Sequence, residues 1–287
     1  MKRIIITAVC VSLLAFGGCG QKQENPEVPQ VEETNVSTDN ADSSVVQIMD
    51  AETEEVVAEV AQEEEAPILD LELVQPNEIG EVMVVMYHSL GESNSAYVRT
   101  TESFRADLER LYAMGFRAIS LEDYVNNNIT TPAGYTPVVL TFDDGHSSNF
   151  TVNEENGELV TDPDCVVGIL EAFYEAHPDF GLEATFFLNG GTPFKQKEYV
   201  AYKLNYIVEK GMDLGNHSTG HEHLPQLNAA QIQKTLGGNI QAIEGIVPGY
   251  EVKTLALPFG ERPKDDYLDS LVTAGEYEGV AYAHNAV

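Results

Sequence analysis

The sequence predicts an α/β protein built on a parallel sheet of about seven strands. Short apolar runs rich in β-branched residues alternate along the chain with segments whose apolar residues recur at helical spacing. The apolar runs are mostly uninterrupted by polar residues, which is typical of strands that helices cover on both faces. Polar side chains follow several runs directly, as they do at the carboxyl ends of the strands in a parallel barrel. An open, doubly wound sheet is the alternative arrangement.

The central predicted strand precedes two adjacent aspartates. Its residues, 137–142, are almost wholly apolar and β-branched, and an Asp-Asp-Gly sequence follows at once. Other apolar runs end beside His88, Asn216 and Pro258, so polar or unusual residues gather at strand ends. The predicted strands are 82–87, 116–121, 138–144, 184–188, 212–216, 253–257 and 279–283.

The predicted helices begin and end at residues suited to those positions. Apolar residues recur at helical spacing from Phe104, Thr100 or Thr101 can cap that helix, and Gly115 can end it. Asn228 can cap the longest helix in the same way. The predicted helices are 101–114, 121–126, 164–177, 197–210, 228–246 and 264–274.

The N-terminus predicts a targeting segment. A short basic segment precedes an apolar stretch, 4–16, that is too short to span a bilayer comfortably. Small residues before Cys19 resemble a bacterial lipoprotein cleavage site, although Phe16 stands where leucine is usual. We therefore predict a lipoprotein-type signal peptide over residues 1–19, with Cys19 as the lipid site and the chain exported to the outer face of the cytoplasmic membrane. An ordinary secretory signal is the alternative, and it would give a secreted protein.

The segment that follows, 20–78, is acidic and poor in aromatic residues. It carries 17 acidic residues and one basic residue, which is half of the net charge of −32. Such a composition cannot bury enough apolar surface to offset the entropy of ordering, so we predict a disordered acidic tether. The negative charge argues against nucleic acid as a partner. The domain predicted at 79–287 contains one cysteine, Cys165, which excludes an internal disulfide.

Two neighbouring carboxylates, Asp143 and Asp144, are the first chemical signal. They come at the end of a predicted buried strand, where like charges raise one pKa unless a cation or a hydrogen bond intervenes. Taken alone, the pair followed by Gly145 is equally compatible with a polar turn.

Two histidines, His217 and His221, are the second signal. If their loop enters a helical turn, imidazoles four residues apart face the same way and can bind one ion. Two histidines and one carboxylate form a common catalytic zinc set, and the aspartate pair supplies that carboxylate with one to spare. The spare carboxylate is a natural general base, and the cation removes the cost of pairing two carboxylates. The alternatives are a chance spacing of histidines and a polar turn.

The two motifs resemble those of a known family. The sequences Thr-Phe-Asp-Asp-Gly at 141–145 and His-Ser-Thr-Gly-His at 217–221 resemble the NodB-type polysaccharide deacetylases, carbohydrate esterase family 4. Residues 84–88 and 184–187 are similar to the family's first strand and to its strand after the acidic motif. The resemblance covers about 82–283 and implies a distorted (β/α) barrel.

The resemblance also implies the roles of individual residues. Asp143 corresponds to the catalytic base, and the metal ligands correspond to Asp144, His217 and His221. We expect one divalent metal ion, with zinc as the first candidate, because two histidines and an aspartate suit several divalent ions.

The third family motif is similar to residues 255–260, with one departure. Many members have an arginine there that orients the base, whereas this chain has Ala256. Pro258 and Phe259 would shape the substrate pocket, and the Phe259 backbone N–H would stabilise an oxyanion. His88 is a further candidate for the pocket, with a structural role as the alternative. The family's later motifs, including the one that supplies the general acid, are not recognisable, so we expect a barrel that is incomplete at the C-terminus.

The sequence therefore predicts a metal-dependent hydrolase that removes acetyl groups from an N-acetylated or O-acetylated polysaccharide of the cell envelope or the extracellular space. Peptidoglycan, chitin-like chains and poly-N-acetylglucosamine are the candidate substrates. A membrane-tethered glycan-binding module that has lost catalysis is the alternative, because Ala256 replaces the arginine and the chain has no tryptophan. An amidase for a non-glycan substrate is a third hypothesis.

Overall fold

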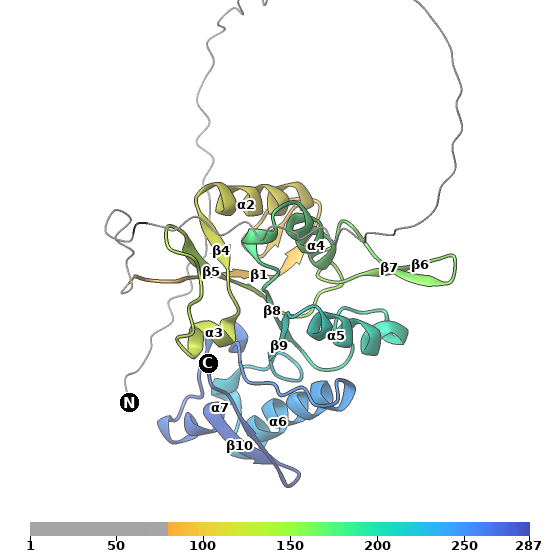
Figure 1. Cartoon of the computed structure of the whole chain (residues 1–287). Helices are drawn as coiled ribbons and strands as arrows, with labels where there is room; N and C mark the ends of the chain where they lie inside the picture. The colour runs from red at the N-terminus through yellow and green to blue at the C-terminus, as the bar shows by residue number, and fades with distance from the viewer. Residues whose placement is uncertain (1–69, 71–79) are drawn as a thin grey trace, which may run out of the picture. The chain divides into compact units, whose positions relative to one another are not determined.

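The computed structural model describes Asp70 and residues 80–287, and the structural statements below concern those residues. The predicted signal peptide, the predicted lipid site Cys19 and the predicted tether apart from Asp70 lie outside this part of the chain. Helices pack around a parallel sheet (Figure 1). No helix of the described residues is both long and apolar enough to cross a membrane.

The parallel sheet is the frame that positions the site. It contains five strands in the order β1-β5-β8-β9, with β4 also paired to β5. The strands are β1 (Met83–Tyr87), β4 (Phe116–Ala118), β5 (Thr136–Phe142), β8 (Thr185–Leu188) and β9 (Asp213–Asn216). Strand β1 occupies one edge of β5, whereas β4 and β8 divide the other edge between them, since β4 pairs with the first residues of β5 and β8 with the last. The predicted α/β class is confirmed.

Strand β5 is buried on both faces, as its unbroken apolar sequence predicts. All five residues from Val138 to Phe142 are buried. The Phe142 ring stacks against Tyr87 at 5.4 Å and against Phe186 at 5.1 Å between ring centroids. Because burying one such side chain contributes about 1.5–3 kcal/mol, the strand that leads to the aspartate pair is firmly anchored in the core.

The helices cover this sheet and largely follow the predictions. They are α2 (Thr101–Ala113), α3 (Leu121–Val125), α4 (Val166–Ala176), α5 (Val200–Glu209), α6 (Ala229–Ile246) and α7 (Ser270–Thr273). Single 3₁₀ turns occur at Pro178–Phe180, Lys197–Tyr199, Leu224–Gln226, Pro258–Gly260 and Asp266–Leu268. Thr100 caps α2 by accepting the Ser103 N–H, and Asn228 forms a capping box with Gln231 at the start of α6, so both predicted caps are confirmed.

Three small two-stranded sheets lie outside the parallel sheet. They pair β2 (Ser89–Leu90) with β3 (Val98–Arg99), β6 (Val152–Glu155) with β7 (Glu158–Thr161), and β10 (Ala274–Tyr277) with β11 (Val280–Ala283). The β6–β7 hairpin was not predicted, although its turn has a recognisable sequence. Asn156 and Gly157 both have positive φ, 55° and 86°, which is the conformation that an Asn-Gly hairpin turn favours.

The last 35 residues differ most from the prediction. The strand predicted at 253–257 is reduced to two isolated parallel bridges, Asn216 to Leu255 and Thr254 to Ala286. The last predicted strand is wrong in its partner, since β11 pairs antiparallel with β10 in a hairpin that turns at Glu278 and Gly279. The helix predicted at 264–274 is replaced by a 3₁₀ turn and the four-residue α7. Within the described residues no pairing closes the sheet, and the closed barrel remains a prediction.

Candidate metal centre

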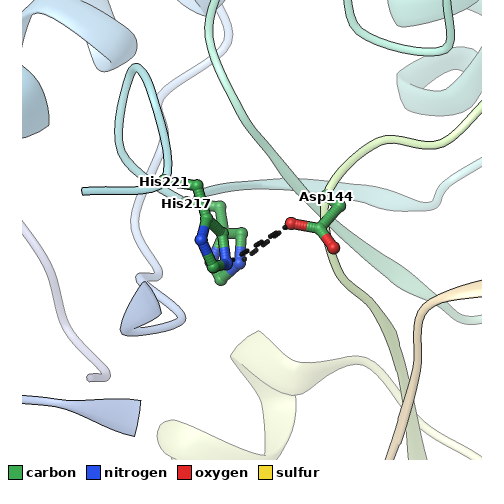
Figure 2. Close-up of side chains that lie close together, drawn as sticks. All are labelled: Asp144, His217 and His221. Atoms are coloured by element: carbon green, nitrogen blue, oxygen red, sulfur yellow. Dashed lines mark ion pairs between the residues drawn. The ribbon is translucent and has the colours of Figure 1, made fainter. Parts of the chain in front are cut away.

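The candidate site lies at the carboxyl ends of β5, β8 and β9. Asp143 and Asp144 follow β5, Asn189 follows β8 and His217 follows β9. Because these strands are parallel neighbours, their carboxyl ends meet at one edge of the sheet. Figure 2 shows the side chains of Asp144, His217 and His221 directed toward one another from two separate loops.

Three of the predicted residues have the spacing of ligands around one cation. Asp144 Oδ1 lies 3.5 Å from Nε2 of His217 and 3.5 Å from Nε2 of His221. One ligand atom from each residue lies within 4.8 Å of the others. Two ligands bound to zinc at tetrahedral angles lie about 3.4 Å apart, so the observed spacing suits a shared ion. Asp143, His217 and His221 also face the same cavity.

The two imidazoles converge for a different reason from the one predicted. Residues 217–221 do not form a helical turn. Instead Ser218 and His221 adopt left-handed backbone conformations, with φ of 64° and 54°. The two imidazole rings lie 4.9 Å apart. Asp144 also has a positive φ, 74°, so two of the three candidate ligands have a backbone conformation that is uncommon for residues other than glycine.

His217 has one nitrogen free for a ligand role. Its Nδ1 lies 2.9 Å from the Ala256 carbonyl oxygen and donates a proton to it. The other nitrogen, Nε2, is buried and has no hydrogen-bond partner in the structure. A buried nitrogen without a partner is costly, and a cation between it and Asp144 would satisfy it. This orphaned atom and the Asp-His-His donor set fit a divalent metal ion.

The charges in the site shift the pKa values of the three candidate ligands in different directions, and a metal ion requires both imidazoles neutral and the carboxylate ionised. Burial alone would lower the pKa of His217, but Asp144 and Asp143 outweigh burial and raise it. Burial and the neighbouring His217 lower the pKa of His221. The pKa of Asp144 lies well below its usual range, first because His146 hydrogen-bonds to it. Asp144 is therefore an anion at neutral pH.

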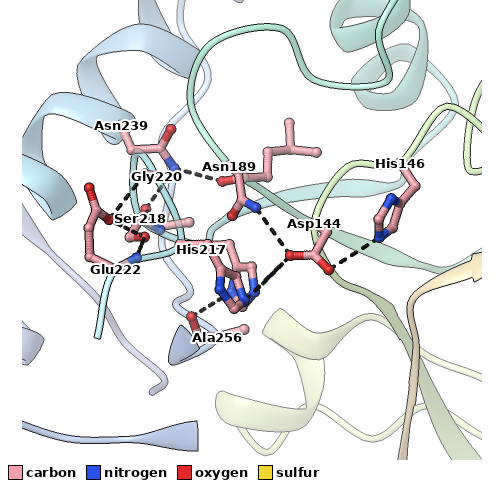
Figure 3. Close-up of polar contacts among 12 residues, drawn as sticks. Asp144, His146, Asn189, His217, Ser218, Gly220, Glu222, Asn239 and Ala256 are labelled. Atoms are coloured by element: carbon pink, nitrogen blue, oxygen red, sulfur yellow. Dashed lines mark hydrogen bonds and ion pairs between the residues drawn. The ribbon is translucent and has the colours of Figure 1, made fainter. Parts of the chain in front are cut away.

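Two residues outside the predicted site, His146 and Asn189, hold Asp144 in place. His146 Nε2 donates to Asp144 Oδ2 at 3.2 Å, and Asn189 Nδ2 donates to Asp144 Oδ1 at 3.1 Å (Figure 3). Only their positions in the sequence could have indicated this role: His146 comes two residues after Asp144, and Asn189 directly follows a buried strand. Both oxygens of Asp144 are therefore hydrogen-bonded, and Oδ1 also lies 3.5 Å from each of the two histidines.

Asp143 lies beside the three converging residues in a much less polar environment. It is 5% exposed, and its Oδ1 is buried without a hydrogen-bond partner. Burial raises the pKa of Asp143 to about 6, with His217 opposing and Asp144 reinforcing the change. The neighbouring third motif supplies no cation to this carboxylate, since Ala256 has no charged group. A carboxylate with a pKa near neutrality can accept a proton effectively.

A groove of about 1130 Å³ opens over these residues. His88 and Phe259 line it, as do Tyr97 and Arg262, whereas Pro258 is buried and is not among its lining residues. The His88 ring lies 4.8 Å from the exposed Tyr97 ring, and burial lowers the pKa of His88. The catalytic roles of these residues remain predictions.

Phe259 forms part of the groove wall in a strained conformation. Its φ is 58°, and the residue as a whole is 54% exposed. The ring stacks on His223 at 3.8 Å and meets His221 edge-on at 4.4 Å. His223 Nδ1 in turn lies 3.0 Å from Glu261 Oε2, within hydrogen-bond distance. His223 is exposed and supports Phe259, and it is not one of the three candidate ligands.

Comparisons with known proteins agree on one family. The polysaccharide deacetylase family model matches residues 131–279, which is more than half of the chain. The Streptococcus pyogenes deacetylase PplD, solved in complex with acetate, is similar in fold, with 18% identity, coverage of 66% of this chain and 77% of that chain, and a TM-score of 0.51. IcaB from Ammonifex degensii is 17% identical, with coverage of 67% and 78% and a TM-score of 0.50. The chain belongs to the polysaccharide deacetylase family and is a deacetylase.

Proposed function

We propose that this deacetylase is metal-dependent and that Asp144, His217 and His221 hold its divalent ion. The observation that carries the proposal is the convergence of these three side chains beside a separate, buried carboxylate, Asp143. Two histidines and one carboxylate are a common catalytic zinc set, and zinc is the ion that we expect. Other divalent ions suit the same ligands.

A bound divalent ion would supply Lewis acidity, which lowers the pKa of water and polarises a carbonyl group. Asp143 would act as the general base, because its carboxylate faces the groove and its pKa is near 6. It would take a proton from the attacking water. The Ala256 carbonyl would keep the proton of His217 on Nδ1, which fixes the orientation of that imidazole.

The reaction would be hydrolysis of an acetamide. Water adds to the acetyl carbonyl, the bond between the carbonyl carbon and the sugar nitrogen breaks, and the nitrogen gains a proton. The products are acetate and a free amino sugar. We infer that the backbone N–H of Phe259 stabilises the developing negative charge and that His88 contributes to substrate binding in the groove that both residues line. The same residues could hydrolyse an O-acetyl ester.

The groove supports a polymeric glycan as substrate. It is long enough to be lined both by Tyr97, before α2, and by Arg262, near the C-terminus. Peptidoglycan, chitin-like chains and poly-N-acetylglucosamine remain the candidates. We propose that the protein meets its substrate outside the cytoplasm, held at the membrane by a lipid on Cys19, on the strength of the N-terminal sequence.

A glycan-binding module without catalysis is the second candidate. The specific observation in its favour is that Asp143 Oδ1 has no hydrogen-bond partner and that Ala256 stands where an arginine orients the base in many relatives. The intact set of Asp144, His217 and His221 speaks for catalysis, because a binding module has no need of these three ligand atoms together.

Acetate release decides between the two candidates. The protein would be stripped with a chelator, reloaded with zinc and given N-acetylglucosamine oligomers or peptidoglycan. We expect zinc-dependent release that Asp143→Asn and His217→Ala abolish and that Asp164→Asn, at an exposed aspartate, leaves unchanged. Glycan binding without acetate release by the folded, zinc-loaded protein would favour the binding module.

A further inference from the structure

One carboxylate closes the histidine loop on itself. Glu222 directly follows the second histidine, and its Oε2 accepts three hydrogen bonds. The donors are Ser218 Oγ at 2.7 Å, the Gly220 backbone N–H at 3.0 Å and Thr235 Oγ1 at 2.6 Å. Two donors belong to the loop 217–221 and the third to α6, so Glu222 joins the loop both to itself and to a long helix (Figure 3).

Glu222 does not take part in the candidate metal set. Its carboxylate is not one of the three converging groups, which are Asp144, His217 and His221. In Figure 3 it lies on the opposite side of the loop from Asp144. The oxygen that carries its contacts already accepts three hydrogen bonds, so its part in the site must be indirect.

Helix α6 provides the fixed end of this arrangement. Thr235 is buried, and its hydroxyl accepts the Thr219 backbone N–H at 3.0 Å while it donates to Glu222. The Thr219 hydroxyl donates to the Thr235 carbonyl oxygen at 2.9 Å. Asn239, also on α6, donates to Asn216 Oδ1. The same oxygen accepts the backbone N–H of Ser218. The loop is therefore held on α6 directly at Thr219 and indirectly at Ser218, through Asn216.

The loop needs such anchoring because of its backbone. Ser218 and His221 have φ values of 64° and 54°, and residues with side chains avoid this region unless their surroundings hold them there. Glu222 accepts hydrogen bonds from Ser218 and Gly220, which lie between the two histidines. Loss of these bonds would therefore let the loop relax and change the direction of the His221 imidazole relative to Asp144.

We propose that Glu222 is a positioning residue, whose carboxylate keeps the histidine loop in the conformation that aims both imidazoles at the metal ion and so sets the affinity of the site. The inference rests on the proposed metal site. Groups that orient metal ligands typically change metal affinity or activity about 10–100-fold when they are replaced. We expect Glu222→Ala to weaken zinc binding within that range.

Two conservative variants separate positioning from a simple effect of charge. Glu222→Gln keeps an acceptor oxygen but loses the charge, so its hydrogen bonds are weaker and its loss of affinity should be smaller than that of Glu222→Ala. Thr235→Val keeps the shape and the net charge but removes one donor to Glu222 and the anchor of Thr219. It should also weaken zinc binding. Glu209→Gln, at an exposed residue, removes the same charge and should bind zinc normally.

The measurement is the zinc dissociation constant of the full chain, determined by competition with a chromophoric chelator. A double variant, His217→Ala with His221→Ala, gives the background from the rest of the chain. Circular dichroism and the melting temperature of the zinc-free variants show whether each is folded. If Glu222→Ala does not fold, the Gln and Val variants still carry the test.

The outcomes are distinct. Wild-type affinity in Glu222→Ala would overturn the inference, even if the melting temperature fell, because the carboxylate would then be structural only. Equal losses of zinc affinity in Glu222→Ala and Glu222→Gln, with normal zinc binding by Thr235→Val, would show that only the charge of Glu222 matters. That result would also overturn the inference. Zinc binding no stronger in the wild type than in the double variant would instead reject the metal site itself.

Discussion

Lys203 on α5 is a fully buried lysine that joins two loops beside the metal centre. Its Nζ donates to the carbonyl oxygens of Phe150 at 2.8 Å and Phe194 at 3.0 Å. The Phe194 N–H donates to Gly145, the residue after Asp144. The buried ammonium group therefore ties the loop after β5 to the loop after β8.

Burial lowers the pKa of Lys203 from 10.5 to about 8. The unfolded chain keeps this proton up to about pH 10.5, whereas the folded protein releases it near pH 8. Between these values the unfolded state binds more protons, so the contribution of Lys203 to the free energy of unfolding rises with pH. The difference between the two pKa values corresponds to about 3 kcal/mol.

Lys203→Met provides the comparison, since methionine has a similar length and no charge. Urea unfolding of both proteins would be measured at about pH 7 and about pH 10.5. We expect the stability of the wild type relative to Lys203→Met to increase by about 3 kcal/mol between these pH values, because other groups titrate alike in both proteins. Lys234→Met, at an exposed residue of α6, should show no such change. A constant difference between wild type and Lys203→Met would refute the reasoning.

Three further predictions concern other parts of the molecule. Burial and the nearby Glu122 and Glu183 raise the pKa of Asp213 to about 7, so the contribution of this residue to stability is lost as the pH rises toward 7. Asp213→Asn should therefore raise the melting temperature at about pH 8 but not at about pH 4. Equal changes in melting temperature at both pH values would contradict this. His223→Ala removes the ring that supports Phe259, a contact of about 1 kcal/mol, and should lower acetate release about fivefold, whereas His223→Phe should retain it. Zinc at 100 times its dissociation constant should stabilise the protein by about 2.7 kcal/mol, seen as a higher melting temperature that chelation reverses and that His217→Ala lacks.

The parts of the fold that could be predicted from sequence are those with strong local patterns. The apolar run before Asp143 predicts β5, and its last five residues are buried because strands pair with both edges and apolar side chains pack on both faces. Asn228 and Gln231 form a capping box from sequence signals alone. These elements depend on residues close together in the chain, and such signals survive tertiary packing.

The C-terminal part could not be predicted in the same way. The run at 253–257 has a strand composition, but its pairing depends on Asn216 and Ala286, which are far away in sequence. The run at 279–283 was assigned to the parallel sheet because it is apolar, while its actual partner is the segment just before it, across the turn at Glu278 and Gly279. Composition indicates that a strand can form and says little about its partner.

The candidate site shows the same limit. The convergence of Asp144, His217 and His221 was expected, although the helical turn invoked to explain it is absent and left-handed residues take its place. His146, Asn189 and Glu222 were not selected, because their roles arise from hydrogen bonds between loops. No spacing rule identifies residues that orient another side chain.

The divided edge of β5 has a consequence for the motions of the site. With β1 on one side and both β4 and β8 on the other, β5 is locked by three neighbours, and its amide protons should be among the slowest in the protein to exchange with solvent. The two aspartates that follow are therefore attached to a strand that is paired along both edges. Tyr97 and Phe259 lie at the exposed rim of the groove, outside the sheet, and are held by ring contacts with His88 and His223 rather than by strand pairing. The enzyme would then hold its reacting groups still while its rim adapts to glycans of different shape.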